Sequence, residues 1–281
     1  MLGCVILNYN DAETTINLLN SIKYYQIFDH IVIVDNKSTD DSFNTLKYVT
    51  QKWGERFSVI LSPRNGGYGF GNNVGIRYCL QLGCKYVLVA NPDVKFSEES
   101  IRCSLEFLQD HEECVAVAPR MIGAGAIRFA TPLKDMTFSV MTLNKLFKPR
   151  YYSDDFYNNK SWVYVDALPG SLVLFDANKF LSVGLYDENV FLYHEEVIIG
   201  KRFAYAGYKS VLLLSQFYHH YHSVSVRKTY KQSIKPKIFA MQSHQYYLKK
   251  YCHANRFELA VFGILKHLAK LEMFIWLRIK K

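Results

Sequence analysis

The sequence predicts an α/β fold: a mainly parallel central sheet with helices on both faces and a C-terminal helical segment after it. Short apolar runs alternate with amphipathic stretches through about the first 120 residues, the pattern of strands and helices that take turns along a chain. The stretches between the runs are long enough for the crossovers that parallel strands require. A length of 281 residues fits one large domain, or one domain with an appended subdomain.

The individual elements can be placed in order. The predicted strands of the first half are residues 3–7, 30–35, 57–61, 86–90 and 115–119. The predicted helices among them are residues 12–25, a segment that begins near 38–41, residues 72–82 and residues 98–110. Residues 120–165 lack a clear period and predict an irregular connection. In the remainder we expect strands within 163–175 and 211–217, a helix over 195–206, and helical structure beyond residue 230.

The net positive charge of the chain comes from its C-terminal part. The formal net charge is +9, yet residues 1–225 contain 21 Lys and Arg against 23 Asp and Glu, whereas residues 226–281 contain 13 against 2. We therefore expect a main domain over residues 1–225 and a basic helical extension over residues 226–281. Charge that is localised in this way favours an anionic partner, such as a membrane surface or a nucleic acid.

The extension ends in a helix with a broad apolar arc and a narrow polar stripe of Lys266, His267 and Lys270. A basic amphipathic helix suits the membrane interface, and packing on the main domain or on a second subunit of a homodimer is an equal alternative. The sequence shows no signal peptide, no run of ~18 uncharged apolar residues, and no C-x-x-C pair among its six cysteines. These features predict a cytoplasmic protein, peripheral on the inner face of the cell membrane if the extension binds lipid.

Polar clusters follow four of the predicted strands. They are Asn8-Tyr9-Asn10, Asp35-Asn36, Asn65-Gly66-Gly67, which opens a glycine-rich segment of residues 65–73, and Asn91-Pro92-Asp93. Because ligands of open α/β sheets bind outside the carboxyl ends of the strands, the four clusters are expected to meet at one edge. Each has a plainer interpretation when taken alone: Asp35 as an Asx-turn or helix cap, the glycines as a flexible loop, and Asn91-Pro92-Asp93 as a common turn.

The glycine-rich segment could let backbone approach a ligand and direct N–H groups at phosphate. Its glycines do not have the G-x-G-x-x-G spacing of dinucleotide-binding oxidoreductases, and they follow the third predicted strand instead of the first. The Gly-Lys-Ser/Thr ending of a Walker motif is also missing. The segment therefore fits neither of these two nucleotide-binding patterns.

Three further features have the residue types of a catalytic site. Asp93, at a strand end, can bind a divalent cation that bridges a diphosphate, and magnesium or manganese suits such oxygen ligands. Glu195 and Glu196 open a predicted helix, where the helix dipole favours acidic residues; at a cleft edge, one of them could instead accept a proton from an attacking hydroxyl. His220, which follows a predicted strand, could contact the metal or diphosphate, or could be a surface histidine.

In this order, the segments resemble the inverting glycosyltransferases of the GT-A fold, most closely the bacterial family-two branch that builds surface polysaccharides and includes the rhamnosyltransferases. The resemblance spans about residues 3–225. It rests on six segments in sequence: residues 5–10, 32–40, 65–75, 91–93, 169–174 and 183–208.

The resemblance implies roles by matched position. The residues that match the nucleotide pocket are Asn8, Asn10, Asp35, Asn65, Gly67 and Asn73. The residues that match the donor-sugar, diphosphate and metal region are Asn91, Asp93, Gly170, Ser171 and His220. Glu195-Glu196 matches a Glu-Asp pair whose second member is the catalytic base, which makes Glu196 the expected base. The family usually has Asp at that place, so Glu195 stays an alternative, and Ile198 stands where a second Asp is common.

The implied reaction is a metal-assisted transfer, with Mg²⁺ or Mn²⁺, from dTDP-rhamnose or a UDP-sugar to a hydroxyl of a glycan or lipid-linked acceptor. Two other functions use the same features. A nucleotidyltransferase would use Asp93 and a metal, but it normally has a glycine-rich basic loop where this chain has Asn8-Tyr9-Asn10-Asp11. A non-catalytic sugar-nucleotide-binding protein would leave both glutamates as helix-start charges. Nucleic-acid binding is disfavoured, because no binding motif is present and the main part is slightly acidic.

Overall fold

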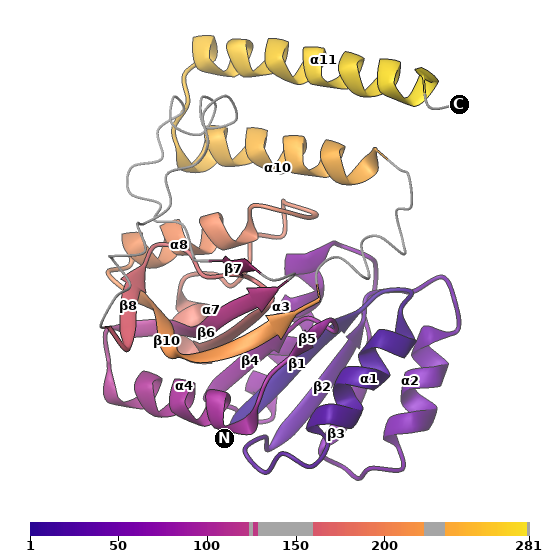
Figure 1. The fold of residues 1–281 in the computed structure, drawn as a ribbon, viewed down its shortest axis with the longest axis vertical. Coiled ribbons are helices and arrows are strands. Elements are labelled where there is room, and N and C mark those ends of the chain that lie inside the picture. The colour runs from indigo at the N-terminus through magenta and orange to yellow at the C-terminus, as the bar shows by residue number, and fades with distance from the viewer. Residues whose placement is uncertain (124–125, 129–159, 222–233, 280–281) are drawn as a thin grey trace.

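A computed structural model describes residues 1–123, 126–128, 160–221 and 234–279, without the side chains of residues 123, 126–128 and 269–279. Within these residues, ten strands form one sheet. Its main path has the order β3-β2-β1-β4-β9-β6-β10-β5, with β7 beside β6 and β8 beside β10. Helices cover both faces of this sheet, and two C-terminal helices lie beyond it (Figure 1). The α/β class predicted from the sequence is confirmed.

The N-terminal half of the sheet is parallel throughout. Its strands are β1 (Leu2–Asn8), β2 (His30–Asp35), β3 (Phe57–Leu61) and β4 (Tyr86–Ala90). The connecting helices are α1 (Ala12–Ile22), α2 (Ser42–Thr50) and α3 (Tyr68–Gln81). Strands β1, β2 and β4 are buried almost without a break, as expected of parallel strands with helices on both faces. The chain turns from β1 toward β2 on one side, while β4 pairs on the other side, so a topological switch point lies between β1 and β4.

The C-terminal half of the sheet is mixed, which the mainly parallel prediction did not include. Strand β9 (Leu172–Asp176) runs antiparallel between β4 and β6 (Cys114–Gly123), and β10 (Lys209–His220) runs parallel to β6. The short strands β5 (Val94–Lys95), β7 (Ala126–Arg128) and β8 (Trp162–Val165) pair antiparallel. An apolar run signals burial on both faces but not the direction of the neighbouring strand.

Three predicted boundaries need correction. The strand expected within 163–175 is two strands, β8 and β9. The connection expected to be irregular from residue 120 is strand at both ends, in β6 and β8, and its residues 124–125 and 129–159 lie outside the described part of the chain. Helix α3 begins at Tyr68, four residues before the predicted start, so most of the glycine-rich segment is helix. Gly71 and Gly75 let this helix lie directly against Leu7 and Val5 of β1.

Two apolar clusters hold the layers together. On one face, α1, α2 and α4 (Glu98–Asp110) pack against side chains of the central strands. On the other face, α3, α7 (Ala177–Ser182) and α8 (Glu195–Tyr205) pack against the alternate side chains of the same strands. Because successive strand residues point to opposite faces, each buried strand contributes to both clusters.

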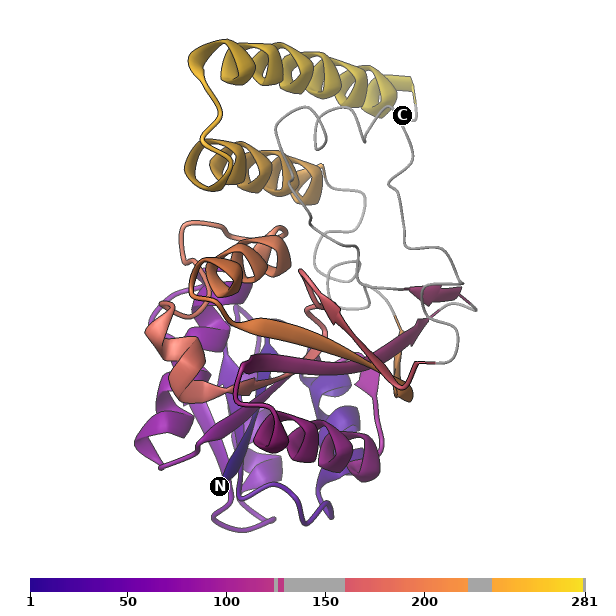
Figure 2. The same ribbon diagram turned by 90° about the vertical axis from the view of Figure 1, so that its left-hand side faces the viewer.

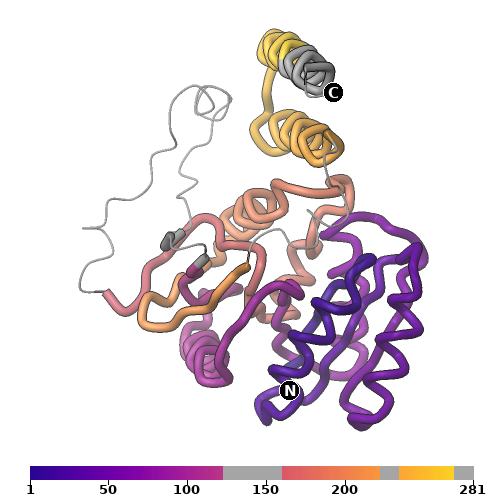
Figure 3. The backbone as a smooth tube through the Cα atoms, turned by 45° about the vertical axis from the view of Figure 1, so that its right-hand side comes forward, coloured from indigo at the N-terminus to yellow at the C-terminus, as the bar shows by residue number. Residues whose placement is uncertain are grey.

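Helices α10 (Lys235–Tyr251) and α11 (Arg256–Ile279) form a hairpin in the predicted extension. Helix α10 lies against α8 through a third apolar cluster of Val190, Ile198, Tyr247 and Tyr251. Helix α11 lies on the far side of α10 from the sheet (Figures 2 and 3). The predicted boundary at residues 225 and 226 falls outside the described residues. Among the helices described, none is both long and apolar enough to span a bilayer.

Candidate active site

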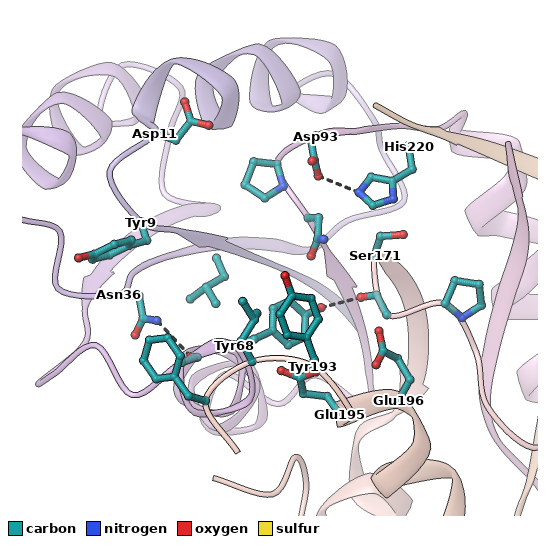
Figure 4. A pocket seen from close by; sticks show the side chains of 18 of the residues that line it. Tyr9, Asp11, Asn36, Tyr68, Asp93, Ser171, Tyr193, Glu195, Glu196 and His220 are labelled. Atoms are coloured by element: carbon teal, nitrogen blue, oxygen red, sulfur yellow. Dashed lines mark hydrogen bonds and ion pairs between the residues drawn. The ribbon is translucent and has the colours of Figure 1, made fainter. Parts of the chain in front are cut away.

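A cleft of about 390 Å³ opens where β1 and β4 diverge, the position at which open α/β sheets bind ligands. Strand ends, the start of α3, the turn before β9, the start of α8 and the end of β10 all contribute to it. Of the predicted site residues, nine line the cleft: Asn65, Gly67, Asn91, Asp93, Gly170, Ser171, Glu195, Glu196 and His220. Figure 4 shows Asp93 and His220 on one side, Glu195 and Glu196 on the other, and Ser171 between them.

The first side of the cleft, here called the acid–imidazole corner, consists of Asp93 and His220. Asp93 directly precedes β5, which pairs antiparallel with β10 in the register His220↔Val94. A backbone hydrogen bond from the Tyr221 N–H to the Asp93 carbonyl, 2.9 Å long, continues this pairing. The result places Asp93 Oδ1 3.2 Å from His220 Nε2, with Asp93 only 8% exposed. Strand pairing therefore brings together two residues 127 positions apart.

The middle of the cleft is a polar floor held by short hydrogen bonds. The Asn91 N–H donates to the Ser171 carbonyl at 2.8 Å, which joins the end of β4 to the turn before β9. The Ser171 hydroxyl bonds to the buried hydroxyl of Tyr218 at 2.7 Å. Tyr68, at the start of α3, donates its hydroxyl to the Gly170 carbonyl at 2.6 Å. These bonds join the end of β4, the turn before β9, the end of β10 and the start of α3 to one another.

The opposite side, here called the glutamate corner, consists of Glu195 and Glu196 at the start of α8. Glu195 is buried, with one carboxylate oxygen that has no hydrogen-bond partner, while Glu196 keeps some contact with solvent. Burial, and then the charge of Glu196, raises the pKa of Glu195 to about 8. Burial also raises the pKa of Glu196, against backbone hydrogen bonds that lower it. A Cβ on Gly170 would come within 2.9 Å of Glu196 Oε1, so glycine makes room for this carboxylate.

The backbone that leads into α8 has an unusual conformation. Tyr193 and His194 both have a φ of 72°, although left-handed backbone is unfavourable for residues that carry a Cβ. Just before them, the Phe191 carbonyl accepts a 2.9 Å hydrogen bond from the Tyr68 N–H. Gly67, with φ 92°, lies so close to this carbonyl that a Cβ would collide with it. Strained backbone next to ionisable groups is common at functional sites.

Four of the predicted nucleotide-pocket residues do not line the cleft. Asn8 and Asp35 are fully buried and bond to each other, Asn8 Nδ2 donating to Asp35 Oδ2 at 2.9 Å. The Ser38 hydroxyl and N–H also donate to Asp35, which is the Asx-turn alternative. Asn10 has its side chain on Thr39 of the next loop. The structure thus gives Asn8, Asn10 and Asp35 a role in joining the ends of β1 and β2.

Asn73, the fourth, holds the loop before α8. Its side chain donates to the Tyr186 carbonyl and accepts from the Tyr186 N–H, both at 3.0 Å, and it also donates to Glu188. It is fully buried in α3. Asn73 therefore supports the loop that leads to the glutamate corner, and it does not line the cleft.

Several cleft residues were not singled out as site residues from the sequence. The most distinctive are Tyr9, Asp11, Asn36, Tyr68 and Tyr193. Asn36 donates to Asn65 Oδ1 and to the Gly67 carbonyl, each at 3.1 Å, and so holds the glycine-rich segment in place. Tyr9, Asp11 and Asn36 directly adjoin predicted residues at strand ends, which was the available signal. Tyr68 lies within the glycine-rich segment, whereas Tyr193 had no signal, because an aromatic residue serves a core and a cleft equally well.

Comparisons with known proteins match most of this chain. Residues 4–175 match the family model of glycosyl transferase family 2. A low-salt glycan biosynthesis hexosyltransferase of Haloferax volcanii is 30% identical over 202 residues, which are 70% of this chain and 59% of that protein. An N-acetylglucosaminyl-diphospho-decaprenol L-rhamnosyltransferase of Mycobacterium tuberculosis is 28% identical over 212 residues, 68% of this chain and 66% of the relative. The chain thus spans slightly less than two thirds of these curated relatives.

Solved structures share the fold. The crystal structure of GalNAc-T7 with UDP, GalNAc and Mn²⁺ has a TM-score of 0.64 to this chain at 15% identity, over 96% of this chain and 53% of that one. S. aureus TarS 1-349 in complex with UDP-GlcNAc has a TM-score of 0.55 at 16% identity, over 79% and 58%. These likenesses establish the GT-A architecture. Because the family model covers more than half of the sequence, the chain belongs to glycosyl transferase family 2.

Proposed function

We propose that this glycosyltransferase moves a sugar from a nucleoside-diphosphate sugar to a hydroxyl of a glycan or lipid-linked acceptor, with inversion at the anomeric carbon. The observation that carries the proposal is the opposition of two corners across one cleft. An acid–imidazole pair suited to a metal-bound diphosphate lies on one side, and a carboxylate with a raised pKa lies on the other. Such a transfer needs a group that accepts the proton of the attacking hydroxyl and, at the other end, a group that stabilises the charge on the departing diphosphate.

The acid–imidazole corner fits a divalent cation. In an octahedral shell with ligands at about 2.1 Å, two neighbouring donor atoms lie about 3.0 Å apart, and Asp93 Oδ1 and His220 Nε2 are 3.2 Å apart. Among the described residues, no group of three or more His, Cys, Asp and Glu could hold a metal. Asp93 and His220 would therefore hold Mg²⁺ or Mn²⁺ together with water and diphosphate oxygens. Such an ion supplies positive charge where the leaving diphosphate gains negative charge.

The glutamate corner supplies the base. Glu196 is the more accessible of the pair, and Glu195, with a pKa of about 8, keeps its proton at neutral pH. Glu196 accepts the proton of the acceptor hydroxyl while that oxygen bonds to the anomeric carbon and the bond from this carbon to the diphosphate oxygen breaks. One displacement from the face opposite the leaving group inverts the configuration. Gly170 and Ser171 lie between the two corners, where the donor sugar would be held.

A donor panel tests this function. Purified protein is incubated with dTDP-rhamnose, UDP-hexoses and UDP-galactofuranose, with and without Mn²⁺, and nucleoside diphosphate release is measured with lipid-linked and glycan acceptors. We expect metal-dependent release with one donor class and a product of inverted configuration by NMR. Retention of configuration would contradict the single displacement. Pyrophosphate release from a nucleoside triphosphate and a sugar phosphate would identify a nucleotidyltransferase instead, and binding without turnover across the panel would favour a sugar-nucleotide-binding protein.

We also propose that α11 docks on an anionic membrane surface, which would bring the cleft to a lipid-linked acceptor. Phe262 faces α10 and is 5% exposed, whereas Phe257, Ile264 and Leu268 are 77%, 63% and 58% exposed. Their spacing of seven and four residues puts the exposed three on one helix face. Residues 226–281 add the excess of 13 basic over 2 acidic residues, and each well-placed Lys or Arg contributes about 1 kcal/mol near anionic lipid.

Liposome flotation tests the docking. With vesicles that contain anionic phosphatidylserine, we expect the chain to float and the variant Ile264→Glu/Leu268→Glu to stay in the dense fraction. Tyr24→Glu/Tyr48→Glu is the control, since it places the same charges on two exposed residues of the main domain. Equal flotation of the α11 variant and the original chain would contradict the proposal. A dimer in solution that the α11 variant converts to a monomer would instead identify the face as an interface between two copies.

A further inference from the structure

The loop between α7 and α8 determines where the glutamate pair lies. Its residues Phe191, Leu192 and Tyr193 line the cleft, and it leads directly into Glu195, the first residue of α8. The last two loop residues, Tyr193 and His194, have left-handed backbone. Non-glycine residues keep this conformation only where their surroundings hold them in it. The contacts that hold residues 191–194 therefore control the start of α8 and the direction of both carboxylates.

Helix α10 contacts the last residues of this loop, just before Glu195. A hydrogen bond 2.8 Å long joins Nδ1 of its residue His244 and Nε2 of His194. The neighbouring Ser243 donates its hydroxyl to the Leu192 carbonyl at 2.9 Å. One turn earlier, the ring of Phe239 packs on Phe191 with 4.6 Å between the centroids. One face of α10 thus contacts the loop at residues 191, 192 and 194.

The same helix holds the other end of the loop through Asp187, which is 3% exposed. Asp187 Oδ2 accepts from the hydroxyls of Tyr251 and Tyr246 at 2.6 and 2.9 Å and from Lys250 at 3.2 Å. Arg202 of α8 pairs with the same oxygen at 3.2 Å. Burial alone would raise the pKa of Asp187, but the hydrogen bonds from Tyr251 and its other donors hold it well below its usual range. The carboxylate is therefore a charged anchor for α10.

The main domain holds different points of the loop. Asn73 binds the backbone of Tyr186, and the Tyr68 N–H binds the Phe191 carbonyl. Both points lie before the left-handed residues. The side-chain hydrogen bonds to residues 192 and 194 come from α10, and His194 is the residue directly before Glu195. Phe262 of α11 stacks on the His244 ring, with centroids 5.0 Å apart and planes 21° apart, which fixes the plane of that ring.

We propose that α10 is part of the catalytic apparatus and that His244 is a positioning residue, whose hydrogen bond to His194 holds the left-handed turn that directs Glu195 and Glu196 into the cleft. The kinetic part of this proposal rests on the proposed function, and the structural part does not. His244 does not line the cleft, so it acts on the reaction through its contact with His194. Small displacements of a catalytic group are costly, since about 1 Å of misplacement can lower turnover 100-fold.

Three variants of the full-length protein test the positioning role. His244→Ala removes the hydrogen bond, whereas His244→Asn keeps a polar atom near the place of Nδ1 and can restore it. Gln242→Ala is the control, because Gln242 is an exposed residue of the same helix. We expect His244→Ala to lower kcat about 10-fold or more with unchanged KM for the donor and unchanged affinity for UDP. His244→Asn should recover most of the loss, and Gln242→Ala should match the original chain.

Hydrogen–deuterium exchange gives a readout that does not depend on transferase activity. His244→Ala should speed exchange of the amides in residues 190–198 and leave residues 86–95, at the acid–imidazole corner, unchanged. Unaltered exchange in residues 190–198 would overturn the proposal, whether or not a donor is found. Equal kcat losses in the Ala and Asn variants, together with a raised donor KM, would also overturn it and leave His244 a packing residue. Absence of turnover in the original chain would count against the proposed function alone.

Discussion

The two corners of the cleft are built in different ways. At the acid–imidazole corner, the backbone pairing of β5 with β10 brings Asp93 to His220. At the glutamate corner, a helix start is held behind two left-handed residues by contacts from α3, α10 and the turn before β9. Sheet pairing brings the first corner together, whereas the second depends on contacts from three separate elements. Remote substitutions should therefore disturb turnover through the glutamate corner and leave nucleotide binding intact.

The largest effect is expected at Glu196, the proposed base. Glu196→Gln removes the proton acceptor without changing the size of the side chain, and should lower kcat by about 10²–10⁴-fold. Its affinity for UDP with Mn²⁺, measured by calorimetry, should stay within about twofold of the original, because the acid–imidazole corner is untouched. Glu106→Gln, an exposed position on α4, is the control. Near-normal turnover in the Glu196 variant would transfer the role of base to Glu195.

Asp93→Ala should give the reciprocal result. Loss of one group that stabilises transition-state charge lowers kcat by about 10²–10³-fold, and here the metal-dependent part of UDP binding should disappear as well. Titration of UDP in the presence and absence of Mn²⁺ measures that part directly. If Asp93→Ala and Glu196→Gln alter UDP binding equally, the two corners do not divide the work as described.

The contrast between the corners also explains what the sequence could predict. Each strand of the parallel half was placed to within one or two residues, because alternation of apolar runs and helices is a local pattern. Each of the four predicted strand-end clusters contributes at least one residue to the cleft, as the rule for strand ends requires. This part of the site follows from topology alone.

Side-chain direction could not be obtained in the same way. Asn8 and Asp35 end neighbouring parallel strands in register, and they turned toward each other instead of the cleft. A polar residue at a strand end has either choice, and only the surrounding loops decide it. The antiparallel insertion of β9 and the hold of α10 on residues 191–194 were likewise invisible, since both are contacts between segments far apart in the chain.

A smaller effect is expected where the main domain supports the glutamate corner. Gly67→Ala adds a Cβ that collides with the Phe191 carbonyl at a φ of 92°, and should cost roughly 2–4 kcal/mol of unfolding free energy and lower kcat about 10-fold. Gly54→Ala is a matched control, with a φ of 100° and nothing within 4 Å of the new Cβ. Its cost should stay at about 1–2 kcal/mol, without a change in kcat. Urea unfolding of both variants makes the comparison. Equal destabilisation would mean that the Phe191 loop yields to the added methyl group.

The smallest effect concerns Glu195 and the pH dependence of stability. Its pKa is raised from 4.5 to about 8, so between these pH values the unfolded chain releases a proton that the folded chain keeps. The native state therefore loses stability as pH rises through this window. Glu195→Gln cannot titrate, and its unfolding free energy relative to the original chain should rise by on the order of 1 kcal/mol or more from pH 5 to pH 8.

Thermal unfolding at several pH values measures this change, which corresponds to about 2–4 °C in Tm for a domain of this size. A constant cost of burying the amide cancels in the trend, and Glu106→Gln should show a flat difference across the same range. A difference that is flat or falling for Glu195→Gln would mean that Glu195 is ionised in the folded protein. Glu196 would then have a charged neighbour instead of a neutral one, and the glutamate corner would contain two competing bases where the structure indicates one.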